Sequence, residues 1–331
     1  MHLTREGMKL DNQSINARYS GRMPVRVTIC LVFLVLLAWR PAVSEPGPAT
    51  AIYVAGADTN AALTKHLTGL LSDALGDRFS LRPFKPGQTS QDDNSIVITL
   101  GPEAFSFVHQ ESRNVPILAL LVDQHFVQGY SVDTEAHLGA ILYAPPLIRQ
   151  AVTGKVILPH ATRVSMLATP DSAALYEQVV SQLPDFGMEG QIFVVNNTDN
   201  LIPTLIRALD YGDFLLAATD NTIYNPRTIK HILLTTYRRN RIVIGPSQAY
   251  VKAGALASTY APLTRVAELA AKIVSDYQET GHFPPAVHPE SFRLEVNQQV
   301  ARSLNIPLPP GQELVMAIKA RLASLTEGDD E

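Results

Sequence analysis

The sequence predicts an α/β protein made of two doubly wound, Rossmann-like lobes joined by a hinge of several crossing segments. Three observations predict this fold class. Short apolar runs alternate with amphipathic helical patterns, which is typical of parallel sheets wound by right-handed crossovers. The alternation occurs twice, once in each half of the chain, and segments rich in proline or small residues interrupt it. The length of 331 residues suits two domains.

Composition excludes several other classes. A hydrophobic fraction of 46% and a charged fraction of 18% are ordinary for a folded protein. No apolar run reaches the roughly 20 residues that span a bilayer, which excludes a multi-span transporter. The formal net charge of −4 argues against a nucleic-acid partner. A single cysteine, Cys30, excludes an intrachain disulfide and a CxxC pair.

The N-terminal region predicts export. Arg18, Arg22 and Arg26 precede an apolar stretch over residues 27–39, and small residues at Ala42 and Ser44 fit a signal-peptidase site. We expect residues 1–44 to be a signal peptide, with translation starting at Met1 or Met23. Cleavage would remove Cys30 and leave 21 basic and 29 acidic residues. An acidic chain without cysteine suits the periplasm of a Gram-negative bacterium. An uncleaved membrane anchor is the alternative.

In the first half, strands are expected at residues 51–55, 79–84, 95–100 and 117–122. The leucine stripe that begins at Leu63 predicts a helix that Gly76 ends. Gly101 and Pro102 mark the start of the next helix, because proline favours the first helical turn.

In the second half, strands are expected at residues 163–168, 192–195, 214–218, 242–245 and 292–296, separated by helices. Pro262 begins a long helix that Gly281 ends, and Asn297 caps a short one. The runs 143–146 and 253–258 are expected to cross between lobes. The predicted division is 1–44 signal peptide, 45–147 plus 257–284 for the first lobe, and 148–256 plus 285–331 for the second.

Polar residues at the carboxyl ends of the expected strands are the candidate ligand-binding residues, because doubly wound sheets bind ligands there. The alternative for each is a helix cap or a turn residue, since Asp, Asn, Ser and Thr are common caps. The candidates are Asp58, Gly101, Glu103, Asp123, Thr169, Asp171, Asn196, Thr219, Asp220, Asn221, Ser247 and Gln248.

The sequence carries no enzyme signature. It has no nucleophile elbow, no P-loop and no GxGxxG after a strand, so no catalytic residue and no cofactor is predicted. His282 and His288 lack a helical ligand spacing, and no metal site is expected. Tyr143, Tyr224 and Tyr250 are candidates either for stacking on a ligand or for packing in the core or hinge.

Four segments resemble the periplasmic substrate-binding proteins of ABC transporters, in the tryptophan/tyrosine-type family. They are ATDNTI at residues 218–223, VKAGALAS at 251–258, RVAELAAKI at 265–273 and FRLEVNQQVARSLNIPLP at 292–309. Weaker matches are ITLGPEA at 98–104, VPILALLVD at 115–123 and ILPHATRVSML at 157–167. The resemblance implies the type I periplasmic-binding fold, with Asp220, Asn221 and the Thr169 loop facing a cleft between the lobes and Gly254 at a crossing strand.

The expected function is therefore that of an exported binding protein, not an enzyme. It would bind a small molecule, an amino acid being one candidate, and deliver it to an inner-membrane ABC permease. It would act as a monomer. The alternative is a periplasmic sensor or accessory module of the same fold, which acts through contacts with a histidine kinase or an outer-membrane receptor.

Overall fold

The computed structural model describes residues 50–56, 61–86, 95–112, 115–130, 137–218, 220 and 222–326. The expected signal peptide lies outside these residues. Within the described part of the chain, none of the helices combines the length and the apolar character that crossing a membrane requires.

The first sheet has five parallel strands in the order β2-β1-β3-β4-β5. Their bounds are Thr50–Gly56 for β1, Phe79–Pro83 for β2, Ile96–Leu100 for β3, Ile117–Val122 for β4 and Leu138–Leu142 for β5. Strands β1, β3 and β4 are almost continuously apolar because helices cover the sheet on both sides. The order places β1 between β2 and β3, so the chain winds outward in both directions from β1.

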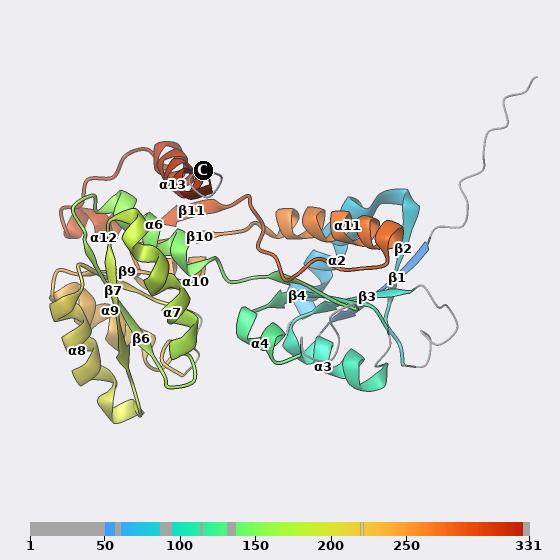
Figure 1. Cartoon of the computed structure of the whole chain (residues 1–331), viewed down its shortest axis with the longest axis horizontal. Coiled ribbons are helices and arrows are strands. Elements are labelled where there is room, and N and C mark those ends of the chain that lie inside the picture. The colour runs from blue at the N-terminus through green and yellow to red at the C-terminus, as the bar shows by residue number, and fades with distance from the viewer. Residues whose placement is uncertain are drawn as a thin grey trace, which may run out of the picture. The chain divides into compact units, whose positions relative to one another are not determined.

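Alternate residues of these strands pack on opposite helix layers. Ile52 and Val54 face α2 (Ala61–Leu75) and α11 (Leu263–Thr280), whereas Tyr53 and Ala55 face α3 (Pro102–Glu111) and α4 (Gln124–Gln128). Figure 1 shows α2 and α11 on one side of this sheet and α3 and α4 on the other. The short 3₁₀ turn Gly76–Arg78 follows α2, at the glycine expected to end it.

The second sheet has six strands in the order β11-β10-β9-β8-β6-β7, of which only β11 runs antiparallel to its neighbour. Their bounds are Arg163–Ala168 for β6, Glu189–Val194 for β7, Phe214–Leu216 for β8, Ile242–Ile244 for β9, Ala257–Tyr260 for β10 and Arg293–Val296 for β11. Each expected strand of this half is present, with β8 and β9 shorter than expected.

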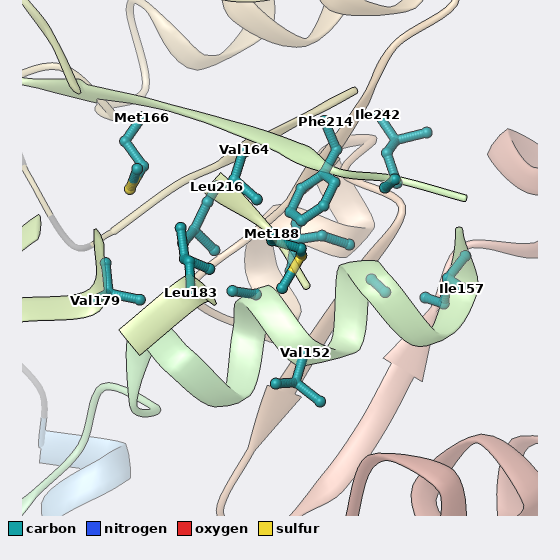
Figure 2. Close-up of a cluster of buried hydrophobic side chains, with 14 of the residues drawn as sticks. Val152, Ile157, Val164, Met166, Val179, Leu183, Met188, Phe214, Leu216 and Ile242 are labelled. Carbon is teal, nitrogen blue, oxygen red and sulfur yellow. The ribbon is translucent and has the colours of Figure 1, made fainter. Parts of the chain in front are cut away.

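One face of the second sheet packs on α6 (Leu147–Ile157), α7 (Ala173–Gln182), α12 (Gln298–Ser303) and α13 (Gly311–Thr326). Figure 2 shows part of this layer, which contains Val164, Leu216 and Phe214 of the sheet and Val152 of α6. The other face packs on α8 (Leu201–Tyr211), α9 (Ile229–Arg238) and α10 (Gln248–Ala253). The 3₁₀ turns Leu183–Phe186 and Thr198–Asn200 precede β7 and α8. Both sheets are therefore doubly wound, as the sequence predicts.

Three segments connect the two sheets with their helices, at residues 143–146, 261–262 and 281–292. The first lies where the sequence predicts a crossing. The run 253–258 was wrongly expected to cross, because it ends α10 and forms the first half of β10. Its small residues are needed for packing: Ala255, Ala257 and Ser258 are fully buried. Gly254 ends α10 at φ 125° and does not lie at a crossing. Residues 257–260 therefore belong to the second sheet.

Helix α6 was not expected from the sequence. Seven of its 11 residues are buried, and these include Arg149, Gln150 and Thr153. A helix enclosed on nearly all sides shows no apolar stripe with a polar opposite face, so the helical period is weak. This unexpected helix begins directly after the first crossing and contributes to the site described next.

Candidate functional site

A cavity of about 620 Å³ lies at the carboxyl ends of strands from both sheets. Asp123 and Leu142 come from the ends of β4 and β5. Thr169, Asp220 and Pro246 follow β6, β8 and β9. The volume is in the range of about 300–1,000 Å³ that ligand pockets occupy. The position matches the rule that open parallel sheets bind ligands outside the carboxyl ends of their strands.

Asp220 is the most enclosed carboxylate of this cavity, at 8% exposure. Its Oδ2 accepts hydrogen bonds from the hydroxyl of Ser172 at 2.6 Å and the hydroxyl of Thr169 at 3.2 Å. Its Oδ1 accepts from the backbone N–H groups of Thr222 at 2.8 Å and Ile223 at 3.2 Å. The Asp220 carboxylate thus connects the loop after β6 to the loop after β8 by hydrogen bonds.

The loop after β6 forms a compact turn of reciprocal hydrogen bonds. The N–H of Thr169 donates to the Ser172 hydroxyl at 2.9 Å, and the N–H of Ser172 donates to the Thr169 hydroxyl at 3.2 Å. Hydroxyl groups favour such local bonds with nearby backbone. Each hydroxyl oxygen accepts a hydrogen bond from a backbone N–H group, and each hydroxyl can therefore direct its own hydrogen to Asp220.

Burial alone raises the pKa of Asp220, but its four donors outweigh that effect and hold the pKa below the ordinary value. The carboxylate is therefore ionised at neutral pH. Among the described residues, no Lys, Arg or His side chain forms an ion pair with it. The cavity contains a buried negative charge that hydrogen bonds stabilise but no neighbouring cation neutralises.

Three tyrosines, Tyr176, Tyr224 and Tyr250, pack near the end of β8, the strand that Asp220 follows. The hydroxyl of Tyr176 accepts a hydrogen bond from the backbone N–H of Ala218, at 3.0 Å. Burial raises the pKa of Tyr176, so it stays neutral. The Tyr250 hydroxyl donates to the backbone oxygen of Tyr224 at 2.6 Å. Tyr224 and Tyr250 pack together at 6.4 Å between ring centroids, and neither lines the cavity. Tyr143 is exposed and also lies outside the lining.

The wall from the first sheet has an irregular backbone. Strand β4 has a bulge between Leu120 and Val122, and Leu121 adopts a positive φ of 59°. Bulges redirect the residues that follow them and are common beside functional sites. Asp123 follows the bulge, and its Oδ1 accepts from the N–H of Phe126 at 2.8 Å, at the start of α4. Gln124 and Gln128 of α4 also line the cavity.

The start of α6 forms a further part of the wall. Pro145 and Pro146 precede the helix, and Leu147 and Ile148 line the cavity beside them. Fully buried Gln150 fixes this helix. Its Nε2 donates to the backbone oxygen of Gly245 at 2.9 Å, and its Oε1 accepts from the N–H of Thr259 at 2.9 Å. The amide thus connects the first crossing to the ends of β9 and β10.

His288 lies in the third crossing and also lines the cavity. Burial and, after it, the Arg149 guanidinium lower its pKa to about 4 despite an opposing backbone hydrogen bond at Ala144, so the imidazole is neutral at pH 7. Arg149 is buried, with a pKa lowered to about 10 by desolvation. Its guanidinium stacks on the Phe292 ring at 4.7 Å and donates to the Pro289 backbone oxygen at 3.4 Å.

Four predicted site residues line the cavity: Asp123, Thr169, Asp171 and Asp220. Five others do not. Gly101 begins α3 with φ 94°, and Glu103 is exposed on that helix. Asn196 follows the edge strand β7 and is exposed. Ser247 precedes α10, and Gln248 bonds Glu295 of β11 at 3.1 Å. Asp58, Thr219 and Asn221 lie outside the described residues.

The sequence did not single out several lining residues. Ser172 stands next to Asp171, which is the more familiar cap. Gln178 and Gln182 lie on α7 and resemble the polar face of an ordinary surface helix. Gln150 belongs to the unexpected α6. Within the described residues, no group of three or more His, Cys, Asp or Glu side chains could hold a metal ion.

Comparison with known proteins gives matches in structure only. No protein-family model matches the chain. No curated protein sequence matches it either. Three solved structures share its architecture. A substrate-binding protein with adhesive properties from Clostridium difficile, in a ligand-free open form, has a TM-score of 0.63 at 13% identity, covering 79% of this chain and 96% of that one. The fold is of the type I periplasmic-binding kind.

Two further structures agree. An ABC domain from Streptococcus pneumonia in complex with L-Trp has a TM-score of 0.54 at 14% identity and covers 79% of this chain and 96% of that one. A conserved domain protein from Vibrio cholerae has a TM-score of 0.55 at 16% identity, covering 83% and 98%. At these identities the likeness establishes the fold and leaves the ligand open.

Proposed function

We propose that this protein is the exported solute-binding component of an ABC-type uptake system and binds a small molecule in the cavity. The observation that carries the proposal is the position of the cavity, at the carboxyl ends of strands from both sheets. The type I periplasmic-binding fold and the signal-like segment at residues 27–39 support it. Membership of the tryptophan/tyrosine-type family is part of the proposal and rests on the four sequence segments.

The mechanism follows from where the lining residues come from. A ligand that contacts Asp123 from the first sheet and Asp171 from the second makes both contacts fully only when the two sides approach. Its higher affinity for that closed state shifts the equilibrium between open and closed forms. An inner-membrane permease that binds the closed form would then receive loaded protein in preference to empty protein. No bond in the ligand is made or broken.

A thermal-shift screen of the purified protein tests this function. The panel contains L-amino acids, amines, sugars and small inorganic anions, each at millimolar concentration. A ligand at 100 times its Kd adds about 2.7 kcal/mol to the free energy of unfolding, which raises Tm by several degrees. A panel in which no compound raises Tm contradicts solute binding and favours the alternative, a sensor or accessory module that acts through protein contacts.

A further inference from the structure

The charged side chains that line the cavity are of one sign. Among the described lining residues there are three carboxylates, Asp123, Asp171 and Asp220, and neither a lysine nor an arginine. His288 is neutral at pH 7 because its pKa lies near 4. Arg149, beside Gln150 on α6, contacts Pro289 and Phe292 and is not part of the lining.

Two helix N-termini supply partial positive charge to the same cavity. Leu147 and Ile148 belong to the first turn of α6, and Ala174 belongs to that of α7. Each N-terminus is equivalent to about half a unit charge. Even with the charge of Arg149, which acts on His288 of the lining, two half charges do not balance three full carboxylate charges. The cavity therefore keeps a negative potential.

The lining also lacks an aromatic surface. None of the described lining residues is Phe, Tyr or Trp. Indole, phenol and sugar rings gain much of their affinity and orientation from stacking on such side chains. The apolar part of the lining is aliphatic instead, from Leu142, Leu147, Ile148, Leu175 and Val179. This surface suits methylene chains.

Resting on the proposed function, we infer that the ligand is an aliphatic compound of net positive charge, carrying ammonium or guanidinium groups. Diamines and basic amino acids share this chemistry. A neutral amino acid does not, because its single ammonium leaves most of the carboxylate charge unmatched.

The three carboxylates have different parts in this binding. Asp171 is exposed on the cavity wall and Asp123 is half-buried, so both can contact an ammonium group directly. Asp220 already accepts four hydrogen bonds. Asp220 therefore acts on the ligand through its charge. Because the side chain is enclosed, water and salt screen this charge only weakly.

Titration calorimetry of the full chain with four compounds of similar skeleton tests the inference. The compounds are 1,5-diaminopentane, L-lysine, L-norleucine and L-2-aminoadipate, whose net charges are +2, +1, 0 and −1. We expect the diamine or lysine to bind at least tenfold more tightly than norleucine, and aminoadipate to bind most weakly. The preference of lysine over the diamine, or the reverse, distinguishes a basic amino acid from an amine. Norleucine or aminoadipate binding as tightly as either cation overturns the inference but leaves solute binding intact. A chain that binds nothing in this series or in the screen above overturns both.

Variants at the two accessible carboxylates give a second test. Asp171→Asn and Asp123→Asn each remove one charge, and asparagine caps a helix about as well as aspartate. We expect each to weaken binding of the cation about tenfold, with unchanged Tm of the free protein. Asp185→Asn, at an exposed position outside the cavity, is the matched control and should bind as the wild type does. Wild-type affinity in both Asp171→Asn and Asp123→Asn overturns the inference.

Discussion

At the residue scale, the sequence indicated the position of Asp220 at a strand end but not its contacts. Asp220 stands at a strand end in a segment that resembles a known family, and it lines the cavity. Its partners were not predictable, because Ser172 lies 48 positions away in the chain and contacts it only in the folded state. The contact makes Asp220 an organiser of two loops as well as a source of charge.

Substitution of Asp220 tests the organising role. Asp220→Asn keeps one oxygen for the N–H groups of Thr222 and Ile223, while the hydroxyls of Ser172 and Thr169 must rotate to accept from the new amide. We expect about 1–2 kcal/mol of lost stability at pH 7, because hydrogen bonds to a charged acceptor become neutral ones. Asp220→Ala should cost more, since it leaves both N–H groups without an acceptor.

The pH dependence of unfolding provides the measurement. The pKa of Asp220 is lowered on folding, so its contribution to stability is present above the ordinary aspartate pKa of about 4 and is lost as pH falls further. Urea unfolding of Asp220→Asn should show a flatter loss below pH 4 than the wild type. If the variant and the wild type had the same stability and the same pH dependence of unfolding, the carboxylate would not stabilise the two loops.

His288 gives a second, separate pH window. Its pKa is 6.5 in the ordinary case and about 4 in the folded protein, where burial and Arg149 disfavour the charged form. The unfolded chain therefore binds the proton first, and stability is full above pH 6.5 and falls between pH 6.5 and 4. His288→Gln should remove part of the Tm difference between pH 7.5 and pH 4.5. His282→Gln, at an exposed histidine, is the control and should leave that difference unchanged.

At the element scale, the alternation of strands and helices was predictable because parallel strands buried on both faces are continuous apolar runs, as in β3 and β4. Helix α6 was not, because burial on nearly all sides removes the amphipathic pattern. A run of small residues can indicate either close packing or a flexible crossing, and the sequence pattern alone does not distinguish the two. Residues 253–258 include many small residues because the chain is closely packed there: Ala255, Ala257 and Ser258 are fully buried.

Alanine substitutions at two helical glycines distinguish the effect of close packing from that of helix propensity. A Cβ at Gly154 of α6 would lie 2.5 Å from the Phe214 ring in the core layer of Figure 2. We expect Gly154→Ala to cost about 1–3 kcal/mol through overpacking. A Cβ at Gly69 of α2 would meet no atom within 4 Å. Gly69→Ala should stabilise by about 1 kcal/mol, because alanine favours helix over glycine. Urea unfolding midpoints measure both, and equal shifts would contradict the packing of α6 against β8.

At the scale of the whole molecule, the two-sheet fold was predictable from sequence, while the exact crossings and the composition of the cavity were not. Residues that converge on the cavity come from α4, α6, α7 and the third crossing, far apart in the chain. Only folding shows that these segments meet. Export is a property that the sequence alone predicts.

Export is tested on cells that produce the full chain. We expect a mature N-terminus near Glu45 and protein in the periplasmic fraction, because residues 27–39 and Ala42 to Ser44 fit a cleaved signal. Intact-mass measurement of the purified protein reads the cleavage position. Full-length chain retained in the inner membrane would establish the alternative, an uncleaved anchor.

Ligand-driven closure is the last expectation and concerns both lobes together. The cavity is lined from both sheets, and three short segments at residues 143–146, 261–262 and 281–292 connect them. A ligand that contacts both sides favours the state in which they are closest, by as much as its affinities for the two states differ. The radius of gyration from small-angle scattering should therefore fall on saturation with the tightest ligand found by calorimetry. The Asp171→Asn and Asp123→Asn double variant, at the same ligand concentration, should stay at the ligand-free value. An unchanged radius in the saturated wild type would mean that binding does not close the lobes, and the permease would then have to recognise the ligand or the loaded surface without a change of shape.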